Sequence, residues 1–147
     1  MKIVTTVTVR SFHTDCFGHV HHARYVELLE EGRWSYMEAH PDIAASLRSQ
    51  RINHAVVHIE IRYESEASLG DRISIETRVQ NARHHGITMR QVMIDERTGK
   101  RLLSADVTNV FYRDKPQNRV ATEDPVFKPW DDLQAVLLKK TQEEKEL

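Results

Sequence analysis

Four consecutive stretches of alternating apolar and polar residues, joined by links too short for a helix, constrain this chain most strongly. In the first, residues 55–63, the odd positions are apolar and most even positions are polar. The others cover 73–79, 87–94 and 102–112, and turns rich in glycine and polar residues separate them. Alternation with a period of two is typical of a strand with one buried face. Because short links favour antiparallel neighbours, we predict an antiparallel sheet.

The N-terminal part of the chain adds one more strand and one long helix. Residues 3–9 are rich in β-branched side chains, which predicts a first strand. From His22 onward, apolar residues recur every three or four positions, as they do on one face of a helix. We expect this helix to end at His40-Pro41, because a residue before proline disfavours the α region. The expected buried face comprises Tyr25, Val26, Leu29, Gly32, Arg33, Tyr36 and Met37.

This order of elements predicts a single α+β domain over residues 1–147, in which a sheet of about five strands packs against one long helix. The expected core spans about residues 3–113. A short second helix is expected over 42–51. The extension 115–147 contains three of the four prolines between 115 and 129, which indicates an extended surface connection, and then a C-terminal helix from Trp130.

Assembly into at least a dimer follows from the same pattern. One helix cannot cover both faces of such a sheet, and Val92, Ile94 and Val110 place apolar side chains on the second face. Pairing with another subunit would cover these positions and an open sheet edge. A homodimer or a homotetramer would satisfy this requirement.

Composition excludes several classes of protein. With 21 basic and 22 acidic residues the formal net charge is -1, which gives no electrostatic case for binding nucleic acid or an anionic membrane. No stretch is apolar enough to span a bilayer, and residues 1–10 do not resemble a signal peptide. The single cysteine, Cys16, excludes an intrachain disulfide and fits a reducing compartment. The expected location is cytoplasmic.

The chemistry is concentrated between Asp15 and Tyr25, where a carboxylate, a glycine and three histidines precede the long helix. An acid or base would lie here beside backbone N–H groups that are free at a helix N-terminus, near Val20 to His22. This combination suits attack on a carbonyl, because the N–H groups stabilise the developing oxyanion. Gly18 is expected to form a turn that a side chain would hinder.

These residues also carry a family resemblance. The stretch Asp15-x-x-Gly18-His19-Val20-x-His22-Ala23-x-Tyr25 resembles the N-terminal motif of hotdog-fold acyl-CoA thioesterases of the 4-hydroxybenzoyl-CoA thioesterase type, including the bacterial long-chain enzymes. Residues 63–73, with the turn Gly70-Asp71, resemble the same family more weakly. The resemblance implies a sheet wrapped around the helix, active sites at a dimer interface, and Asp15 as the catalytic carboxylate. It implies an acyl-CoA substrate and no metal or redox cofactor.

The chain departs from the family pattern at two places. Many relatives have paired asparagines where this chain has His21-His22, and a proline is common at the position of Glu66. These differences leave the choice of acyl group open. A hotdog dehydratase or hydratase with an Asp15/His22 pair is one alternative function, and a non-catalytic acyl-CoA-binding domain is another.

Individual residues keep alternative interpretations. Asp15 could cap a turn, and His22 could either orient substrate or serve as a polar residue at the helix start. Cys16 could be a nucleophile, and the cluster of His19, His21 and His22 could bind a metal, but neither has diagnostic spacing. If Asp15 is not the base, the helix acids Glu27, Glu30 and Glu31 are the next candidates. Further substrate contacts, to the acyl group or to the phosphates of coenzyme A, are expected from Tyr25, Arg83 and Arg90.

Overall fold

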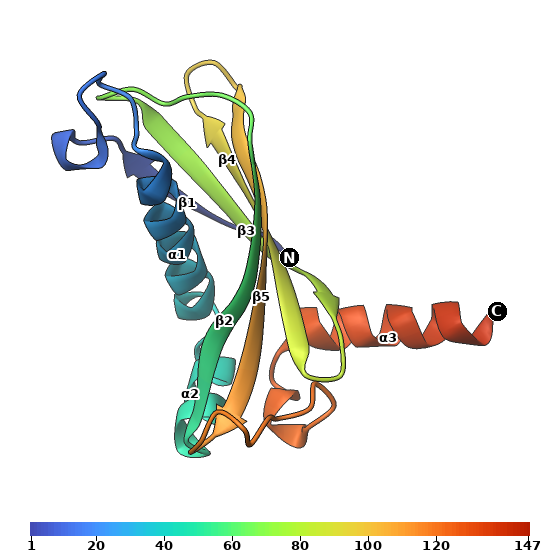
Figure 1. The fold of residues 1–147 in the computed structure, drawn as a ribbon. Helices are drawn as coiled ribbons and strands as arrows, with labels where there is room; N and C mark the ends of the chain where they lie inside the picture. The colour runs from blue at the N-terminus through green and yellow to red at the C-terminus, as the bar shows by residue number, and fades with distance from the viewer.

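The computed structural model describes residues 1–147 as one curved sheet with three helices (Figure 1). The strands are β1 (Ile3–Thr8), β2 (Ile52–Tyr63), β3 (Arg72–Ala82), β4 (Gly86–Asp95) and β5 (Arg101–Arg113). The helices are α1 (His22–Glu38), α2 (Pro41–Ser49) and α3 (Asp131–Lys145), with short 3-10 turns η1 (Ser11–His13) and η2 (Pro125–Phe127). No helix combines the length and the apolar character that crossing a bilayer would require.

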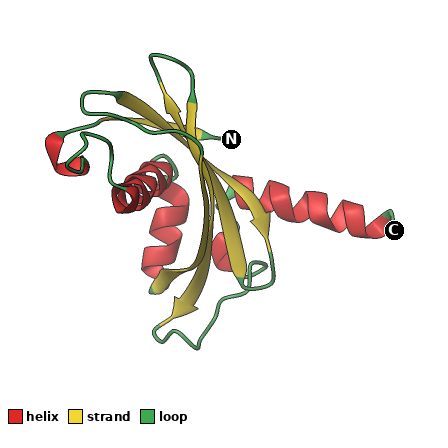
Figure 2. Cartoon of the chain, turned by 45° about the horizontal axis from the view of Figure 1, so that its top comes forward, coloured by secondary structure: helices red, strands yellow, loops and turns green.

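The sheet is antiparallel throughout, in the order β1-β3-β4-β5-β2, which confirms the predicted α+β class. The strands β3, β4 and β5 form a meander through the two predicted turns. The first and second strands of the chain instead form the two edges of the sheet. Figure 2 shows α1 and α2 on one side of the sheet, which we call the inner face.

Helix α1 packs on the inner face through a stripe close to the predicted one. Tyr25, Leu29 and Tyr36 are buried as expected, and Leu28 joins them. Gly32 allows the closest approach, because a Cβ atom at this position would lie 2.7 Å from Ile75 Cγ2. The charged Arg33 on the same stripe is half-buried, which becomes important for the site.

The C-terminal extension is packed against the domain, so the predicted surface connection over 115–129 is wrong in part. Val126 and Phe127 in η2 are buried in one cluster with residues of α1 and α2, together with Trp130. Helix α3 begins beside the C-terminal end of α1, where Tyr36 and Trp130 both bond to one polar network. The extension therefore covers the part of the inner face that α1 does not reach.

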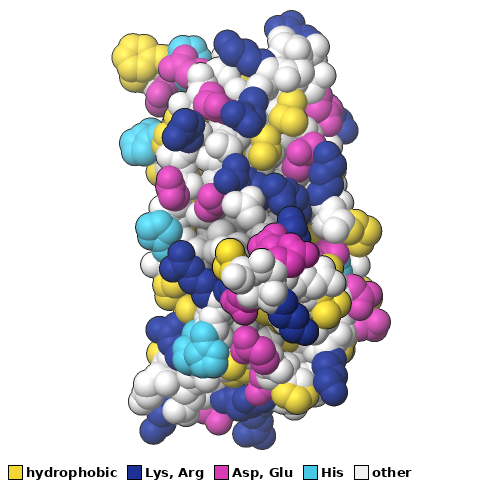
Figure 3. Space-filling view, turned by 90° about the vertical axis from the view of Figure 1, so that its right-hand side faces the viewer, with side chains coloured by type: hydrophobic (Ala, Val, Ile, Leu, Met, Phe, Trp, Pro, Cys, Tyr) yellow, Lys and Arg dark blue, Asp and Glu magenta, His cyan; other side chains and the backbone are white.

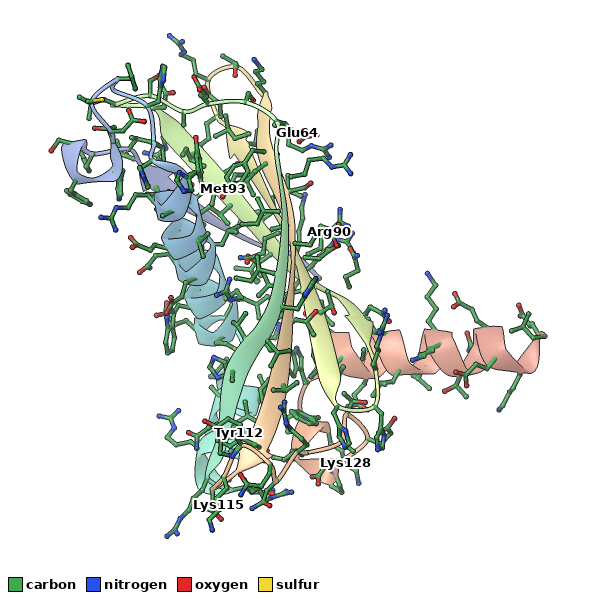
Figure 4. All side chains as sticks on the ribbon, viewed as in Figure 1. Glu64, Arg90, Met93, Tyr112, Lys115 and Lys128 are labelled. Carbon is green, nitrogen blue, oxygen red and sulfur yellow. The ribbon has the colours of Figure 1, made fainter.

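The outer face of the sheet is more polar than the sequence suggested. Arg90 projects from it, away from α1, and forms a two-pronged ion pair with Asp106, whereas Met93 lies on the side of α1 (Figure 4). Seen from the side on which α3 projects, basic and acidic side chains are interspersed (Figure 3). Val92 and Ile94 are half-buried and Val110 is already buried within the chain. The outer face therefore gives no apolar surface of the kind that the sequence-based prediction of a dimer relied on.

The edge of the sheet at β2 is open in the single chain. The alternation predicted for residues 55–63 breaks at a bulge between Val56 and His58, so both Val56 and Val57 are exposed, at 39% and 53%. Trp34 on the adjacent surface of α1 is 53% exposed. A long edge strand beside exposed apolar side chains is a surface on which another chain can pair.

Candidate active site

The segment before α1 forms a tight loop that places the predicted catalytic residues close to the helix N-terminus. The backbone of residues 13–15 runs antiparallel to that of residues 19–21, with bonds from Asp15 N to His19 O and from His21 N to His13 O. Gly18 lies at the tip with φ of +77°, a conformation that favours glycine. The turn expected at this glycine is therefore present.

One oxygen of the Asp15 carboxylate shapes this loop and the other is unengaged. Asp15 Oδ1 accepts hydrogen bonds from the N–H groups of Phe17 at 2.9 Å and His19 at 3.4 Å. No protein group bonds to Oδ2, and the side chain is partly accessible. The turn-capping role and the catalytic role, which were alternatives in the sequence, are thus compatible, since each uses a different oxygen.

The helix N-terminus offers fewer free donors than the sequence suggested. The N–H of Val20 donates to Ala67 O at 2.9 Å and that of His21 donates to His13 O at 2.9 Å, so both are occupied. The N–H of Ala23 is capped by His21 Nδ1 at 3.2 Å. The N–H of His22 opens α1 and has no partner inside the helix. Of the expected donors from Val20 to His22, only the N–H of His22 is therefore without a partner, and the expectation that those of Val20 and His21 are free is wrong.

The His22 side chain is exposed and is not bonded to Asp15. Its ring lies against that of His21, with centroids 4.3 Å apart. Its carbonyl oxygen accepts from the hydroxyl of Tyr63 at 3.1 Å, which ties the start of α1 to the end of β2. An Asp15/His22 acid–base pair within one chain therefore has no supporting contact.

Three of the expected substrate contacts lie elsewhere. Tyr25 is 4% exposed and its hydroxyl accepts from Ala67 N at 3.0 Å, so its ring packs in the core and its burial keeps it from a substrate in the single chain. Arg90 is engaged by Asp106 on the outer face. Arg83 lies in the turn between β3 and β4, at the opposite end of the sheet from the Asp15 loop (Figure 1). A single chain does not bring either arginine to Asp15.

A cavity that the sequence did not predict lies under the C-terminal half of α1. Its volume is about 200 Å³, and it opens beside β2, where Trp34 and Val56 are exposed. Most of its wall is apolar. The lining residues are Glu30, Arg33, Trp34, Met37, His54, Val56, Ile87, Met89, Asn109, Phe111 and Trp130. We call this the α1–β2 cavity.

Arg33 is the positively charged group of this cavity, which Glu30 also lines. Its NH1 donates to Gln91 Oε1 at 3.0 Å, and no carboxylate forms an ion pair with it. Burial lowers the pKa of Arg33, although the nearby Glu30 opposes this effect. The pKa of His54 at the cavity mouth is lowered, mainly by burial and then by the charge of Arg33. In the sequence, the one sign of this cavity was the charged Arg33 on the predicted buried face of the helix.

The remaining reactive side chains do not form a second centre. Cys16 is exposed at the loop tip. Nowhere in the chain do three side chains of the metal-binding types His, Cys, Asp and Glu gather at one point. Of the reserve carboxylates, Glu27 pairs with Arg24, whereas Glu30 accepts from Trp34 Nε1 at 3.2 Å and lines the cavity.

An antiparallel sheet curved against one long helix, with a carboxylate in the loop that leads into that helix, defines the class of hotdog-fold thioester hydrolases. Residues 9–135 match the thioesterase-like superfamily. The long-chain acyl-CoA thioesterase FadM of Escherichia coli (strain K12) is 34% identical over 119 residues, which are 81% of this chain and 89% of that protein. The chain belongs to the thioesterase-like superfamily, and the predictions of a hotdog fold and a thioester hydrolase are confirmed.

Solved structures agree with this assignment. The crystal structure of YbaW, a probable thioesterase from Escherichia coli, has a TM-score of 0.81 at 31% identity, over 88% of this chain and 97% of that chain. A 1,4-dihydroxy-2-naphthoyl-CoA thioesterase from Synechocystis has a TM-score of 0.77 at 15% identity, over 92% of this chain and 96% of that chain. The second likeness shows the fold alone.

Proposed function

We propose that this protein hydrolyses an acyl-CoA thioester to a free acid and coenzyme A, with Asp15 as the catalytic carboxylate. The observation that carries the proposal is that the two oxygens of this carboxylate have different surroundings. Oδ1 is held by two loop N–H groups, while Oδ2 is free beside the N-terminus of α1. The 34% identity to a long-chain acyl-CoA thioesterase supports the choice of substrate.

Two routes use the same groups. In the first, Oδ2 takes a proton from water while the water oxygen attacks the thioester carbonyl carbon. In the second, Oδ2 attacks this carbon, coenzyme A thiolate leaves, and water then hydrolyses the mixed anhydride. In both routes the oxyanion of the tetrahedral intermediate would accept a hydrogen bond from the N–H of His22. Collapse of this intermediate then breaks the C–S bond. A thiolate is a good leaving group, so neither route requires a metal or a redox cofactor.

The working unit in this proposal is a homodimer joined along β2. Isologous twofold pairing of the β2 edges would extend the sheet and cover Val57 and Trp34, which are exposed in the single chain. Two such dimers could form a tetramer. The free, exposed Cys16 is compatible with the reducing environment of the cytoplasm, where we place the enzyme.

Twofold pairing would also complete the active site. Along α1, Arg33 lies about 16 Å from His22 at a rise of about 1.5 Å per residue, so Asp15 is distant from the α1–β2 cavity of its own chain. Tyr63, at the end of β2, bonds to His22. Antiparallel pairing of two β2 strands would bring this end of one subunit beside His54 and Val56 of the other. The cavity of one subunit would then receive the acyl group of a thioester held at the partner subunit's Asp15.

The decisive variant is Asp15→Asn. Because the amide oxygen can still accept the two loop N–H bonds, the loop keeps its shape while the carboxylate charge and the base are lost. We expect release of free thiol from acyl-CoA to fall by at least about a hundredfold. Asp15→Ala should lose as much activity and, in addition, loosen the loop. His22→Ala should cost less, since its backbone N–H remains.

Asp42→Asn, an exposed carboxylate near the start of α2, is the matched control and should retain full activity. Activity of Asp15→Asn within a few-fold of wild type, together with an inactive Glu30→Gln, would move the chemistry to α1. A change in enoyl absorbance without thiol release would instead identify a dehydratase or hydratase. Binding of acyl-CoA with neither change would identify a non-catalytic binding domain.

A further inference from the structure

Arg33 is a half-buried positive charge in a mostly apolar cavity, and although Glu30 lies nearby, no carboxylate forms an ion pair with it. Only one of its N–H groups is engaged, in the bond to Gln91 Oε1. Gln91 is fully buried and its own N–H groups donate to Leu29 O at 2.8 Å and Thr77 Oγ1 at 2.9 Å. The amide of Gln91 thus fixes the guanidinium in place but does not neutralise it, and the remaining N–H donors can bind an acceptor in the cavity.

Asn109 provides a second polar group in the same cavity. It lies on the inner face of β5, opposite Ile87 of β4, and only 5% of its surface is exposed. Its side-chain amide makes no hydrogen bond to the protein, although it lines the cavity. No fully buried side-chain N or O atom lacks a hydrogen-bond partner in the structure, so the amide atoms of Asn109 are accessible at the cavity wall and can bond to a molecule that enters it. Two polar side chains with free hydrogen-bonding groups in one small, mostly apolar cavity indicate a site for a polar ligand atom.

We propose that the α1–β2 cavity selects acyl groups that carry an oxygen acceptor remote from the thioester, bound by Arg33 and Asn109. This inference rests on the proposed acyl-CoA thioesterase function and specifies its substrate class. The apolar wall around Met89 and Phe111 contacts the methylene groups, while the two polar side chains bind the oxygen. Glu30 on the same wall is already bonded to Trp34. The oxygen of the acyl group that Arg33 and Asn109 bind belongs either to a carboxylate, which the guanidinium charge would hold, or to a neutral hydroxyl.

Matched substrates test this selectivity. Hexanoyl-CoA is compared with adipoyl-CoA and ω-hydroxyhexanoyl-CoA, and dodecanoyl-CoA with dodecanedioyl-CoA, by thiol release. A site that hydrogen-bonds a substrate group discriminates strongly against the analogue that lacks it. We expect kcat/KM for at least one oxygen-bearing substrate to exceed that of its plain counterpart by about tenfold or more. The carboxylate and hydroxyl substrates separate the two forms of the acceptor. Equal rates, or a preference for the plain chain in both series, would overturn the proposal.

The variant Arg33→Met separates recognition from a structural role. Loss of the guanidinium should abolish the preference, whereas a merely structural effect would lower the rates of both members of a pair alike. Arg78→Met removes the same charge from the outer face of β3 and should leave the preference intact. If Arg33→Met does not fold, Asn109→Leu provides the second test and should reduce the preference at least several-fold. Retention of the full preference in a folded variant of either residue would refute the assignment.

Product binding distinguishes failure of this inference from failure of the proposed function. Calorimetry with wild-type protein compares adipate and ω-hydroxyhexanoate with hexanoate, and dodecanedioate with dodecanoate, and requires no turnover. If no thioester is hydrolysed but an oxygen-bearing acid still binds about tenfold more tightly than its plain counterpart, the cavity assignment stands and the catalytic proposal fails. If thioesters are hydrolysed but the acids of each series bind equally, only the selectivity is refuted.

Discussion

Replacement of Tyr36 by phenylalanine should destabilise the protein more than any other loss of a single hydroxyl group. Tyr36 is fully buried, and its hydroxyl donates to Asp132 Oδ2 at 2.5 Å while accepting from Trp130 Nε1 at 2.9 Å. Burial raises the pKa of this phenol, so the hydroxyl remains a donor at every physiological pH. It therefore joins the C-terminal end of α1 to the start of α3.

The magnitude follows from the two bonds. A hydrogen bond to a charged group contributes about 1.5–3 kcal/mol, and leaving the buried indole N–H of Trp130 without a partner costs about 1–3 kcal/mol. Because the two effects share one atom and Asp132 keeps other partners, we expect Tyr36→Phe to lower the free energy of unfolding by about 2–4 kcal/mol. With a typical urea m value of about 1–3 kcal/mol/M, the midpoint should fall by roughly 1 M or more.

Urea unfolding followed by circular dichroism, at one fixed protein concentration, measures this change. Tyr112→Phe is the matched control, because the hydroxyl of Tyr112 near the end of β5 makes no hydrogen bond to the protein (Figure 4). It should unfold within about 0.5 kcal/mol of wild type, as most surface substitutions do. A loss of under about 0.5 kcal/mol in Tyr36→Phe would refute the reasoning and show that the network contributes no net stability.

Further predictions concern charge and assembly. Burial alone would raise the pKa of Asp132, but bonds from Tyr36 and the N-terminal ammonium lower it below 3.8. The stabilising effect of this carboxylate is therefore complete above that value and is lost as pH falls through the lower pKa of the folded state. Asp132→Asn should accordingly make the free energy of unfolding depend less on pH in acid. Because the charge of Arg33 helps to lower the pKa of His54, an NMR titration should place this pKa below 6.5 and Arg33→Met should raise it; an unchanged value would show that the charge is screened. Val57→Glu should convert a dimer to monomers in sedimentation, whereas a wild-type monomer at micromolar concentration would contradict pairing along β2. Chelator should leave thiol release unchanged, and recovery of lost activity by zinc would reassign the histidines near Asp15 as a metal site.

Local patterns predicted the elements of this fold because each depends on neighbouring residues. The alternation after Ala55 and the helical spacing after His22 reflect the pleat and the helix period, which the chain carries within a few positions. The bulge after Val56 was not predictable, since it arises from pairing with β5. Trp130 was expected to start a helix, but its bond to Tyr36 joins segments that only the folded chain brings together.

The candidate site likewise has a part that could be predicted from neighbouring residues and a part that could not. Asp15, Gly18 and the start of α1 are close in the sequence, so the loop could be located from the motif. The α1–β2 cavity could not, because Arg33, Gln91 and Asn109 come from three elements and meet only through the register of β4 and β5. The occupied N–H groups of Val20 and His21 were likewise hidden, since the acceptor of Val20 is Ala67, far along the chain.

The position of β1 has a consequence for the order in which the parts of the enzyme fold. The meander β3-β4-β5 closes through short turns, whereas β1 pairs only with β3, across almost half of the chain. Loop closure over long separations costs more entropy and makes folding slower. We expect β1 and the catalytic loop that follows it to dock last, onto a preformed sheet. Pulsed hydrogen exchange during refolding should therefore protect the amides of β4 before those of β1, and activity should recover only with the second phase.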